Sequence, residues 1–458
     1  MIDDSSFKTK LRAFLLNNIV TVVFIFIIVL GLSVSTNLTF DFLMNELIAR
    51  FFRNGFLVLS LIIPVIAGLG LNFGIVVGAL AGMLSLIVVR YFNLGGISGL
   101  MLSFLIALPL AMLFGFATGK LYNKTRGQEM IASYIVGFFA NGLYQFIVLF
   151  ALGVIIPLSK GHVMVKPDGV GLRSTFDMGP HPLSRTFNPE TQTPGLRYAL
   201  DWIWRAPFLP MLIAFGICFL VFLVVRRMLA QKNPALKQSK SWAFILSCSL
   251  CVALIILGVY GLLVPDNFLS GIREIPVVTG IVILALCLFT QYFTKTKLGQ
   301  DCRSVGFDQH IAEVSGINVD RTRIIATMIS TVLASWGMII YLQNMGTVST
   351  YTSHMQIGMF AVAALLVGGA TKAKANIKNA LLGLVLFNAM FIVSPDIGRL
   401  FSGDEGVGEY TRSFMVYGVI SLALWLYAWK TLKAEKNKEL QYAWMDDEPD
   451  TKTPESKE

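Results

Sequence analysis

The amino-acid sequence predicts an all-α polytopic membrane protein with about 10–12 transmembrane helices, some of them re-entrant or broken. Of its 458 residues, 55% are hydrophobic and only 14% are charged, whereas soluble domains carry about 25% charged residues. Apolar runs of near-spanning length follow one another along the chain, and each crossing needs about 20 apolar residues whose backbone groups bond within a helix. The cations, which give a net charge of +10, gather in short loops and at the two ends, as the positive-inside rule predicts for cytoplasmic connections.

The first part of the chain divides into a polar terminus and a block of apolar runs. Residues 1–12 are polar and basic and are predicted to be a cytoplasmic amino terminus. Residues 13–156 form the first transmembrane block. Its opening run, residues 13–33, is longer than the apolar core of a signal peptide and has no small-residue cleavage site after it, so we expect a retained helix. Residues 34–54 are expected to be an outer connection.

Two apolar runs, residues 55–71 and 74–92, are separated by very little polar sequence. Gly74, Gly78 and Gly82 recur every four residues in the second run, which clears one helix face for the close approach of a neighbouring helix. The turn between the runs is either buried by protein within the membrane or part of a tight helical hairpin. The sequence leaves both interpretations open.

The longest connection is predicted at residues 157–205. It is rich in proline and glycine and ends in an aromatic cluster that contains Trp202 and Trp204. Connections of this length are typically functional or partly disordered. The basic loops on either side place it outside the cytoplasm, and tryptophans are typical of a membrane interface.

The second transmembrane block is predicted at residues 206–430, and a polar, basic segment at residues 295–323 interrupts it. The distribution of charge places this segment in the cytoplasm, together with both termini. Residues 431–458 are expected to be a disordered cytoplasmic tail, because the end of the chain is acidic and contains proline.

Several other functions lack their signatures in this sequence. The phosphate-binding pattern GxxxxGK[ST] is absent, since the nearest stretch, residues 115–120 (GFATGK), has the wrong spacing. The cysteines and histidines show no metal-ligand spacing and no disulfide framework. The cations are divided among short loops, which does not favour nucleic-acid binding. Ionisable residues are scarce in the apolar runs, which argues against ion-coupled transport. We therefore expect no enzyme activity, no metal and no cofactor in this chain.

Neutral polar residues in or beside the apolar runs are candidates for a translocation path. Side-chain amides and an indole can form hydrogen bonds with a neutral solute as it crosses. The alternative is hydrogen bonding between helices, worth about 0.6 kcal/mol per contact, which better explains any one of these residues taken alone. The candidates are Asn72, Asn141, Gln145, Trp336 and Asn388.

The segment 295–323 has a pattern that favours docking to a soluble partner. Ile311, Val314 and Ile317 fall at helical spacing, while charged residues lie on other faces. This pattern predicts a short amphipathic helix at the membrane surface.

The same segment resembles a family of inner-membrane permeases from ABC importers for branched-chain amino acids, ribose and other simple sugars, and nucleosides. The family's cytoplasmic segment reads approximately RAVGxNPxAAxxxGI, and this chain departs from it at Asp308, Gln309 and Ile311, which replace asparagine, proline and alanine. The resemblance implies a coupling helix, centred on residues 306–317, that seats in an ATPase subunit. The implied coupling residues are Arg303, Gly306, Asp308, Ile311, Ala312, Glu313, Gly316 and Ile317.

Two further stretches carry the resemblance. Residues 362–386 contain a Gly-Gly pair, a short polar stretch and a small-residue helix, as the family pattern does. Residues 121–141 (LYNKTRGQEMIASYIVGFFAN) resemble the nucleoside and simple-sugar branch, with Glu129 and Ile131 in matching positions.

The resemblance implies a non-catalytic permease subunit of an ATP-driven importer in the bacterial cytoplasmic (inner) membrane. Its implied partners are a second permease subunit, identical or similar, two ATPase subunits that bind ATP and magnesium, and an extracytoplasmic solute-binding protein. The implied cargo is a small polar solute such as a nucleoside or a simple sugar. A vitamin such as riboflavin, or branched-chain amino acids, are alternative cargoes, and a secondary carrier or channel that works without an ATPase is the alternative class.

Overall fold

The computed structural model describes residues 18–35, 38–159, 161–180, 195–232, 241–264, 268–269, 271–272, 274–371, 375–404, 406–418, 420–422, 425–426 and 428–429. The predicted cytoplasmic amino terminus at residues 1–12 and the predicted tail at residues 431–458 lie outside these ranges.

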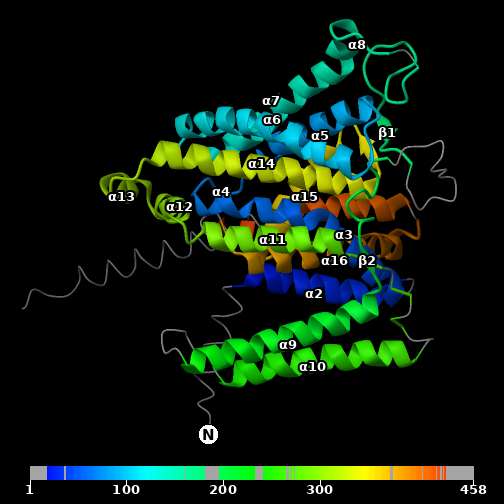
Figure 1. Ribbon diagram of the computed structural model, residues 1–458, viewed down its shortest axis with the longest axis vertical. Helices are drawn as coiled ribbons and strands as arrows, with labels where there is room; N and C mark the ends of the chain where they lie inside the picture. Colours follow the sequence, from blue (N-terminus) through cyan, green and yellow to red (C-terminus); the bar gives the residue numbers. More distant parts are fainter. Residues whose placement is uncertain are drawn as a thin grey trace, which may run out of the picture.

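The described residues form a bundle of helices with two short pairs of strands, which confirms the predicted all-α class (Figure 1). In chain order, the helices before residue 160 are α2 (Ile19–Val34), α3 (Phe40–Ser60), α4 (Ile62–Ile66), α5 (Ile75–Tyr91), α6 (Gly96–Lys124), α7 (Glu129–Phe146), the π-helical turn η1 (Ile147–Ala151) and α8 (Leu152–Val154). Those that follow are α9 (Phe208–Lys232), α10 (Ser241–Leu263), α11 (Val277–Phe293), α12 (Lys297–Phe307), α13 (Gln309–Val314), α14 (Val319–Met345), α15 (Ser353–Val367) and α16 (Ile377–Ser402). The strands are β1 (Thr175–Asp177), β2 (Arg205–Ala206), β3 (Ile275–Pro276) and β4 (Thr347–Ser349).

Seven of the described helices are long and apolar enough to cross a membrane, and α11 with α12, which are bent by 74° at their junction, make an eighth candidate. Three shorter apolar helices, α2, α5 and α15, belong to the same bundle. The chain is therefore a multi-pass membrane protein. The bend after α11 falls where the sequence predicted the change from an apolar run to the polar segment at residues 295–323.

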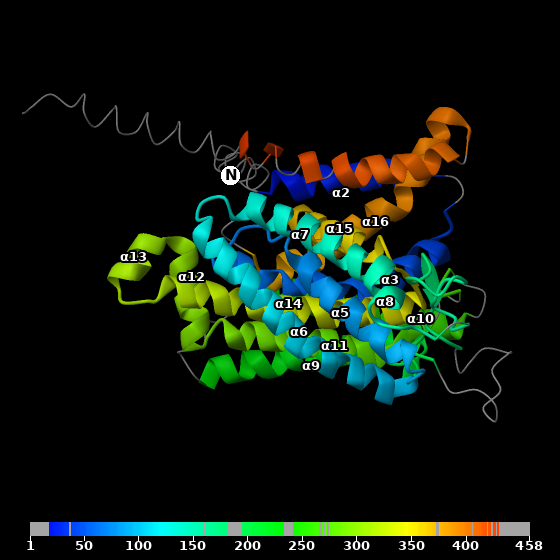
Figure 2. The same ribbon diagram turned by 90° about the horizontal axis from the view of Figure 1, so that it is seen from above.

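The connections between helices gather at two opposite ends of the bundle. The α4–α5 turn, the α6–α7 turn and the pair α12–α13 lie at one end, which we call the coupling end because it carries the predicted coupling residues. The strand pairs β1–β4 and β2–β3 lie at the other, which we call the far end. In both views α13 protrudes beyond the helices around it (Figures 1 and 2).

The longest buried helix, α14, lies in the middle of the bundle and packs on α3, α5 and α6. Glycines on the two neighbours permit this approach. A Cβ atom added to Gly78 of α5 would lie 2.6 Å from the carbonyl oxygen of Thr331, and one added to Gly119 of α6 would lie 2.9 Å from the Cα atom of Ile324. Gly82 likewise faces the backbone of Ser335. Two of the three glycines predicted to form a packing face, Gly78 and Gly82, therefore pack against α14, whereas Gly74, which precedes α5, lies against Tyr122 and Asn72.

The structure decides between the two interpretations of the turn near Asn72. A tight hairpin is wrong, because α3 packs on α14 and α16 while α5 packs on α14 and α6, so that α14 separates the two arms. The turn itself is buried by protein: Leu69, Leu71 and Asn72 are all less than 4% exposed.

The expected outer connection at residues 34–54 is wrong, since α3 begins at Phe40 and is continuous through most of that range. Its first half carries charges that mask a helix in a hydropathy profile, but these charges have partners within the protein. Glu46 pairs with Arg50 at 3.1 Å, and Arg53 donates a hydrogen bond to Asn344 at 2.8 Å.

The described part of the predicted long outer connection is tied to the far end. Strand β1 pairs antiparallel with β4, which directly follows α14, and β2 pairs with β3, which precedes α11. Asp201 is buried and accepts hydrogen bonds from Thr279 and Asn344. Trp202 and Trp204 remain exposed, as an interfacial position requires.

Candidate functional site

The polar segment at residues 295–323 folds into two short helices instead of the single helix expected. Helix α12 begins after Thr296, whose side-chain oxygen accepts a hydrogen bond from the backbone nitrogen of Gly299. It ends at Asp308, which is extended and starts α13 by accepting hydrogen bonds from the backbone nitrogens of His310 and Ile311 at 2.8 and 3.1 Å. Asp and Asn are equally good at this capping position. The departure of Asp308 from the family's asparagine therefore leaves the helix start intact.

Small and apolar residues hold helices α12 and α13 on the side that faces the bundle. The Cα atom of Gly306 lies against the backbone of Ile66 and Gly68 in the α4–α5 turn, which leaves no room for a side chain. Val305 and Ala312 form a small buried core with Val319 of α14. The element is therefore held against the bundle while its outer face remains free.

Helix α13 ends in a tight turn at Gly316, whose φ of +81° lies in the left-handed region. The nitrogen of Ile317 bonds to the carbonyl of Ala312, and that of Gly316 to the carbonyl of Glu313, which is the arrangement of a Schellman cap. Ile317 then packs against the core of Val305, Ala312 and Val319.

Three apolar side chains project from this element into solvent. Phe307, Ile311 and Val314 are 86%, 56% and 77% exposed, respectively, and we refer to them as the apolar tip. Exposed apolar surface rimmed by polar residues is typical of a protein-binding site. The amphipathic pattern indicated the exposed Ile311 and Val314, whereas Phe307 was missed, because it lies on α12 outside the pattern.

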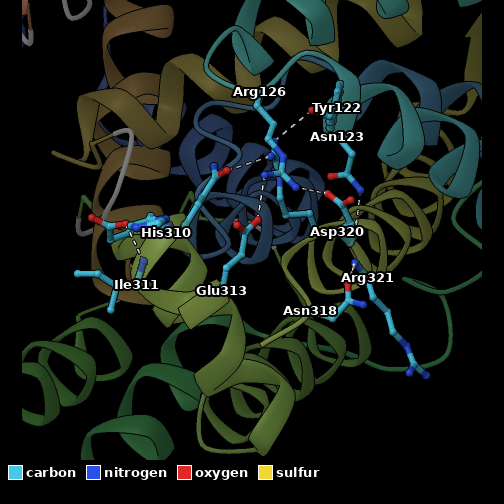
Figure 3. A network of polar contacts seen from close by, with 12 residues as sticks. Tyr122, Asn123, Arg126, His310, Ile311, Glu313, Asn318, Asp320 and Arg321 are labelled. Atoms are coloured by element: carbon cyan, nitrogen blue, oxygen red, sulfur yellow. Dashed lines mark hydrogen bonds and ion pairs between the residues drawn. The ribbon is translucent and has the colours of Figure 1, made fainter. Parts of the chain in front are cut away.

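A network of ion pairs braces α13 against the α6–α7 turn (Figure 3). Arg126, in that turn, reaches Glu313 of α13 at 3.0 Å and Asp320 at the start of α14 at 2.6 Å. Hydrogen bonds to Asp320 and then to Glu313 raise the pKa of Arg126 above its ordinary value. Asn123 also donates a hydrogen bond to the carbonyl of Asp320 at 2.9 Å.

A second ion pair lies deeper. Arg323 of α14 is fully buried, and its guanidinium is 2.6 Å from Glu129 at the start of α7. The same guanidinium donates to the carbonyl of Tyr122 at 3.3 Å and lies 3.5 Å from the side chain of Gln309 on α13. Glu129 was noticed in the sequence as part of a family pattern, whereas Arg323 was not, because its partner is distant in the chain.

The eight predicted coupling residues thus fall on one protruding element but differ in what they do locally. Gly306 and Ala312 are packed against the bundle, Asp308 caps α13, and Gly316 and Ile317 end it. The exposed members are Arg303, Asp308, Ile311, Glu313 and Gly316.

The five candidates for a translocation path do not come together as one set. Asn72 stabilises the α4–α5 turn by accepting hydrogen bonds from Tyr122 at 2.8 Å and from the nitrogen of Gly74 at 2.9 Å. Trp336 donates to the carbonyl of Phe104 at 3.3 Å. Asn388 belongs to a separate contact with Asn54, 3.3 Å away, and donates to a carbonyl in its own helix.

Asn141 and Gln145, by contrast, belong to one polar cluster, which also contains Tyr144 and His354. Nε2 of His354 lies 2.7 Å from Oδ1 of Asn141, and Gln145 donates to the same oxygen at 3.4 Å. The rings of Tyr144 and His354 lie 5.1 Å apart. The Tyr144 hydroxyl and Nδ1 of His354 are buried and have no hydrogen-bond partner among the described residues. The sequence did not indicate His354, because it is remote from Asn141 in the chain.

An open cavity of about 770 Å³ adjoins this polar cluster at Gln145. Tyr351 and residues of β1 and the segment before it complete its wall, and α7 passes into the π-helical turn η1 beside it. Such turns are frequent at functional sites. The lining includes Gln145, Lys166, Arg173, Ser174, Thr175 and Tyr351.

Fold and site together define a multi-pass helical membrane protein with an exposed apolar tip on a protruding element at one end of its bundle. Residues 196–426 match the model of the family described as branched-chain amino acid transport system / permease component, and the chain belongs to this family. This confirms the resemblance that residues 295–323 indicated.

Three curated relatives illustrate the range of the family. The nucleoside ABC transporter permease protein of Lactococcus lactis subsp. cremoris is 33% identical over 92 residues, which are 19% of this chain and 25% of the relative. The high-affinity branched-chain amino acid transport system permease protein of Escherichia coli is 30% identical over 108 residues, covering 23% and 34%. The xylose transport system permease protein of Haemophilus influenzae is 29% identical over 174 residues, covering 38% and 43%. The chain thus matches between a quarter and less than half of the length of each relative, and no solved structure matches it.

Proposed function

We propose that this chain is the transmembrane permease subunit of an ATP-driven ABC importer in the bacterial inner membrane. It forms the path for a small polar solute, a nucleoside or a simple sugar, that an extracytoplasmic binding protein delivers. Family membership supports the transport role, and the relatives named for nucleosides and xylose support the cargo class. The chain itself is non-catalytic, and ATP and magnesium bind to the partner ATPase subunits. A second permease subunit completes the translocation unit.

The observation that carries the proposal is the apolar tip of Phe307, Ile311 and Val314 on an element that is rigidly held from behind. In this proposal the tip seats in a surface groove of the ATPase. ATP binding moves the ATPase subunits, and in this proposal ion pairs transmit the movement to the bundle. Glu313 and Asp320 transmit it to Arg126, and Arg323 transmits it to Glu129. Because these pairs connect α13 and α14 to the start of α7, the movement shifts whole helices relative to one another.

The polar cluster at the other end of α7 is then a contact for the solute. Its unpartnered Tyr144 hydroxyl and His354 nitrogen support this role, because a buried polar atom without a partner costs about 1–3 kcal/mol. Gln145, which donates a hydrogen bond to Asn141 in this cluster, lines the adjoining cavity, so a hydrogen-bonding solute there would meet the cluster at this amide. Because the cluster and the coupling element lie at opposite ends of α7, one helix links the two.

The coupling role is tested by changing Ile311 and Val314 together to Glu in the full-length chain. We expect the variant to insert in the membrane but to lose co-purification of ATP-hydrolysing activity from native membranes, and to lose uptake. Val163→Glu is the matched control, since Val163 is similarly exposed, at 55%, but lies at the far end. Undiminished ATPase association in the double variant would refute the coupling role.

The cargo and the class of transporter are tested by uptake. Radiolabelled nucleosides or pentoses should enter cells, and vanadate should inhibit this uptake. An excess of the unlabelled cargo should also reduce the uptake of the labelled solute. Branched-chain amino acids, the cargo named for another relative, and riboflavin are the alternatives in the same assay. Uptake that persists in a strain without the ATPase would instead indicate a secondary carrier or channel.

A further inference from the structure

A lateral groove of about 620 Å³ opens on the side of the bundle between α6, α11 and α14. Its lining is apolar throughout, and the indole nitrogen of Trp336 is already bonded to the carbonyl of Phe104. The groove therefore offers no free polar atom to a solute and differs in character from the cavity beside the polar cluster. Its lining includes Met112, Ala285, Phe289, Ile325, Val332 and Trp336.

The length of the groove along α14 is close to the thickness of one leaflet's hydrocarbon layer. Along α14 it runs from Ile325 to Trp336, which at about 1.5 Å per residue is roughly 16 Å. Half of a hydrocarbon core of about 30 Å is about 15 Å. The groove thus begins near one membrane surface, at the coupling end, and ends near the middle of the bilayer.

Two cationic side chains, Arg321 and Lys120, lie near the end of the groove at the coupling end. Arg321 precedes Ile325 by one helical turn on the same face of α14, and Lys120 follows Met112 by two turns on the same face of α6. Both side chains are exposed. Phe116 lies between Met112 and Lys120, and its ring centroid is 4.5 Å from the Lys120 ammonium.

Arg321 differs from its neighbours Arg126 and Arg323, which are both ion-paired. Among the described residues, no carboxylate lies within ion-pair distance of its guanidinium. Figure 3 shows its side chain extending away from the network around Arg126. Arg321 is therefore free to bind an anion at the membrane surface.

We propose that the lateral groove holds an acyl chain of an anionic phospholipid whose phosphate lies at Arg321 and Lys120. Basic positions between helices at a membrane surface bind anionic headgroups, and guanidinium geometry suits a phosphate. The acyl chain leaves one apolar environment for another, so its transfer contributes little selectivity. The two cations therefore set the preference for an anionic lipid, and the groove sets the position of the lipid.

The site touches both helices that frame the coupling element, since α11 leads into α12 and α14 follows α13. A lipid seated there packs against α11 and α14 at the same time. Its presence would hold the spacing of these two helices behind the apolar tip.

The proposal is tested by native mass spectrometry of the full-length protein after exchange into equal mixtures of phosphatidylglycerol and phosphatidylcholine with the same acyl chains. We expect the wild-type protein to retain phosphatidylglycerol preferentially, and Lys120→Gln with Arg321→Gln to reduce that preference about tenfold. Arg226→Gln is the matched control, because Arg226 is an exposed cation on α9, which does not line the groove. The preference should survive in this control.

A second variant separates the chain-binding part of the site from the headgroup part. Ala285→Phe fills the groove from α11 and should reduce retention of both lipids, and Ala285→Leu should do so to a smaller degree. Equal retention of the two lipids by the wild-type protein, or an equal loss of preference in Arg226→Gln, would overturn the proposal. A shift in oligomeric state on filling the groove, without a change in retained lipid, would assign the groove to a second copy of the chain and also overturn it.

Discussion

Arg323 and Glu129 show at the scale of single residues how the coupling end is held together. The guanidinium is fully buried in α14, and the carboxylate that neutralises it comes from the start of α7. Removing one member of a buried pair leaves the other charge without compensation, whereas replacing both by apolar residues is often neutral. The pair therefore contributes mainly by making the two helices depend on one another.

We predict that Glu129→Leu alone lowers the free energy of unfolding by about 3–5 kcal/mol. Glu129→Leu combined with Arg323→Met should recover most of this loss, because no buried charge remains. Thermal unfolding of the purified protein in detergent measures both. Glu409→Leu is the control, since Glu409 pairs with Arg412 at an exposed position and its loss should change little. A single variant at Glu129 as stable as the wild type would contradict the prediction.

The residues that the sequence missed share one property. Arg323 is recognisable only from its contact with Glu129, and His354 only from its contact with Asn141. Both partners are distant in the chain, so no local pattern marks them. Asp308, by contrast, was named from the family pattern in its own segment, and the structure shows it as the cap of α13, which is a local feature of the chain. Its coupling role stays a prediction.

At the scale of elements, the packing of α5 and α6 on α14 depends on the absence of side chains. Gly78 and Gly119 face backbone atoms of α14. A Cβ atom added to either glycine would lie less than 3 Å from those atoms. Because the opposing atoms are backbone, they cannot turn aside as a flexible side chain would. A substitution must therefore push the helices apart.

We predict that Gly78→Val reduces stability by about 1–3 kcal/mol, the usual cost of overpacking, and reduces uptake in parallel. Gly142→Ala in α7 is the matched control, because no atom lies within 4 Å of the position where its Cβ would stand. That change should be neutral or slightly stabilising, since alanine favours a helix over glycine. Unfolding curves of both variants measure the change in stability. A Gly78→Val protein as stable as the wild type would refute the close packing of α5 on α14.

Helix α3 and the pair α12–α13 show where element prediction failed. The first half of α3 was expected to belong to an outer connection, yet it is helical and its charged residues have partners within the protein. The coupling segment was expected to be one helix, but Asp308 is extended and divides it. In both places the outcome depends on contacts that hydrophobic periodicity does not describe.

At the scale of the whole molecule, the fold places the described connections between helices at two opposite ends of the bundle. The coupling end carries Arg126 and the α12–α13 pair, and the far end carries the strand pairs. That the coupling end faces the cytoplasm stays a prediction from the positive-inside rule.

We predict that a cysteine at Val163 is labelled by a membrane-impermeant maleimide added to intact cells, whereas a cysteine at Ile311 is labelled only after the cells are opened. Both positions are more than half exposed, so accessibility to the reagent depends on the side of the membrane. The five natural cysteines are first replaced by serine or alanine. Labelling of position 311 in intact cells would reverse the proposed orientation.

The sequence by itself determined the fold class, the closely packed Gly78 and Gly82 of α5 and the position of the polar segment that folds as α12 and α13, because composition and periodicity depend on neighbouring residues. Only the tertiary structure decided that Asn141 and Gln145 meet Tyr144 and His354 while Asn72, Trp336 and Asn388 lie elsewhere. It also decided that α14 separates α3 from α5 and that Arg126 braces α13. The physical reason is that hydrogen bonds, ion pairs and helix contacts between distant segments depend on which faces the packed bundle brings together.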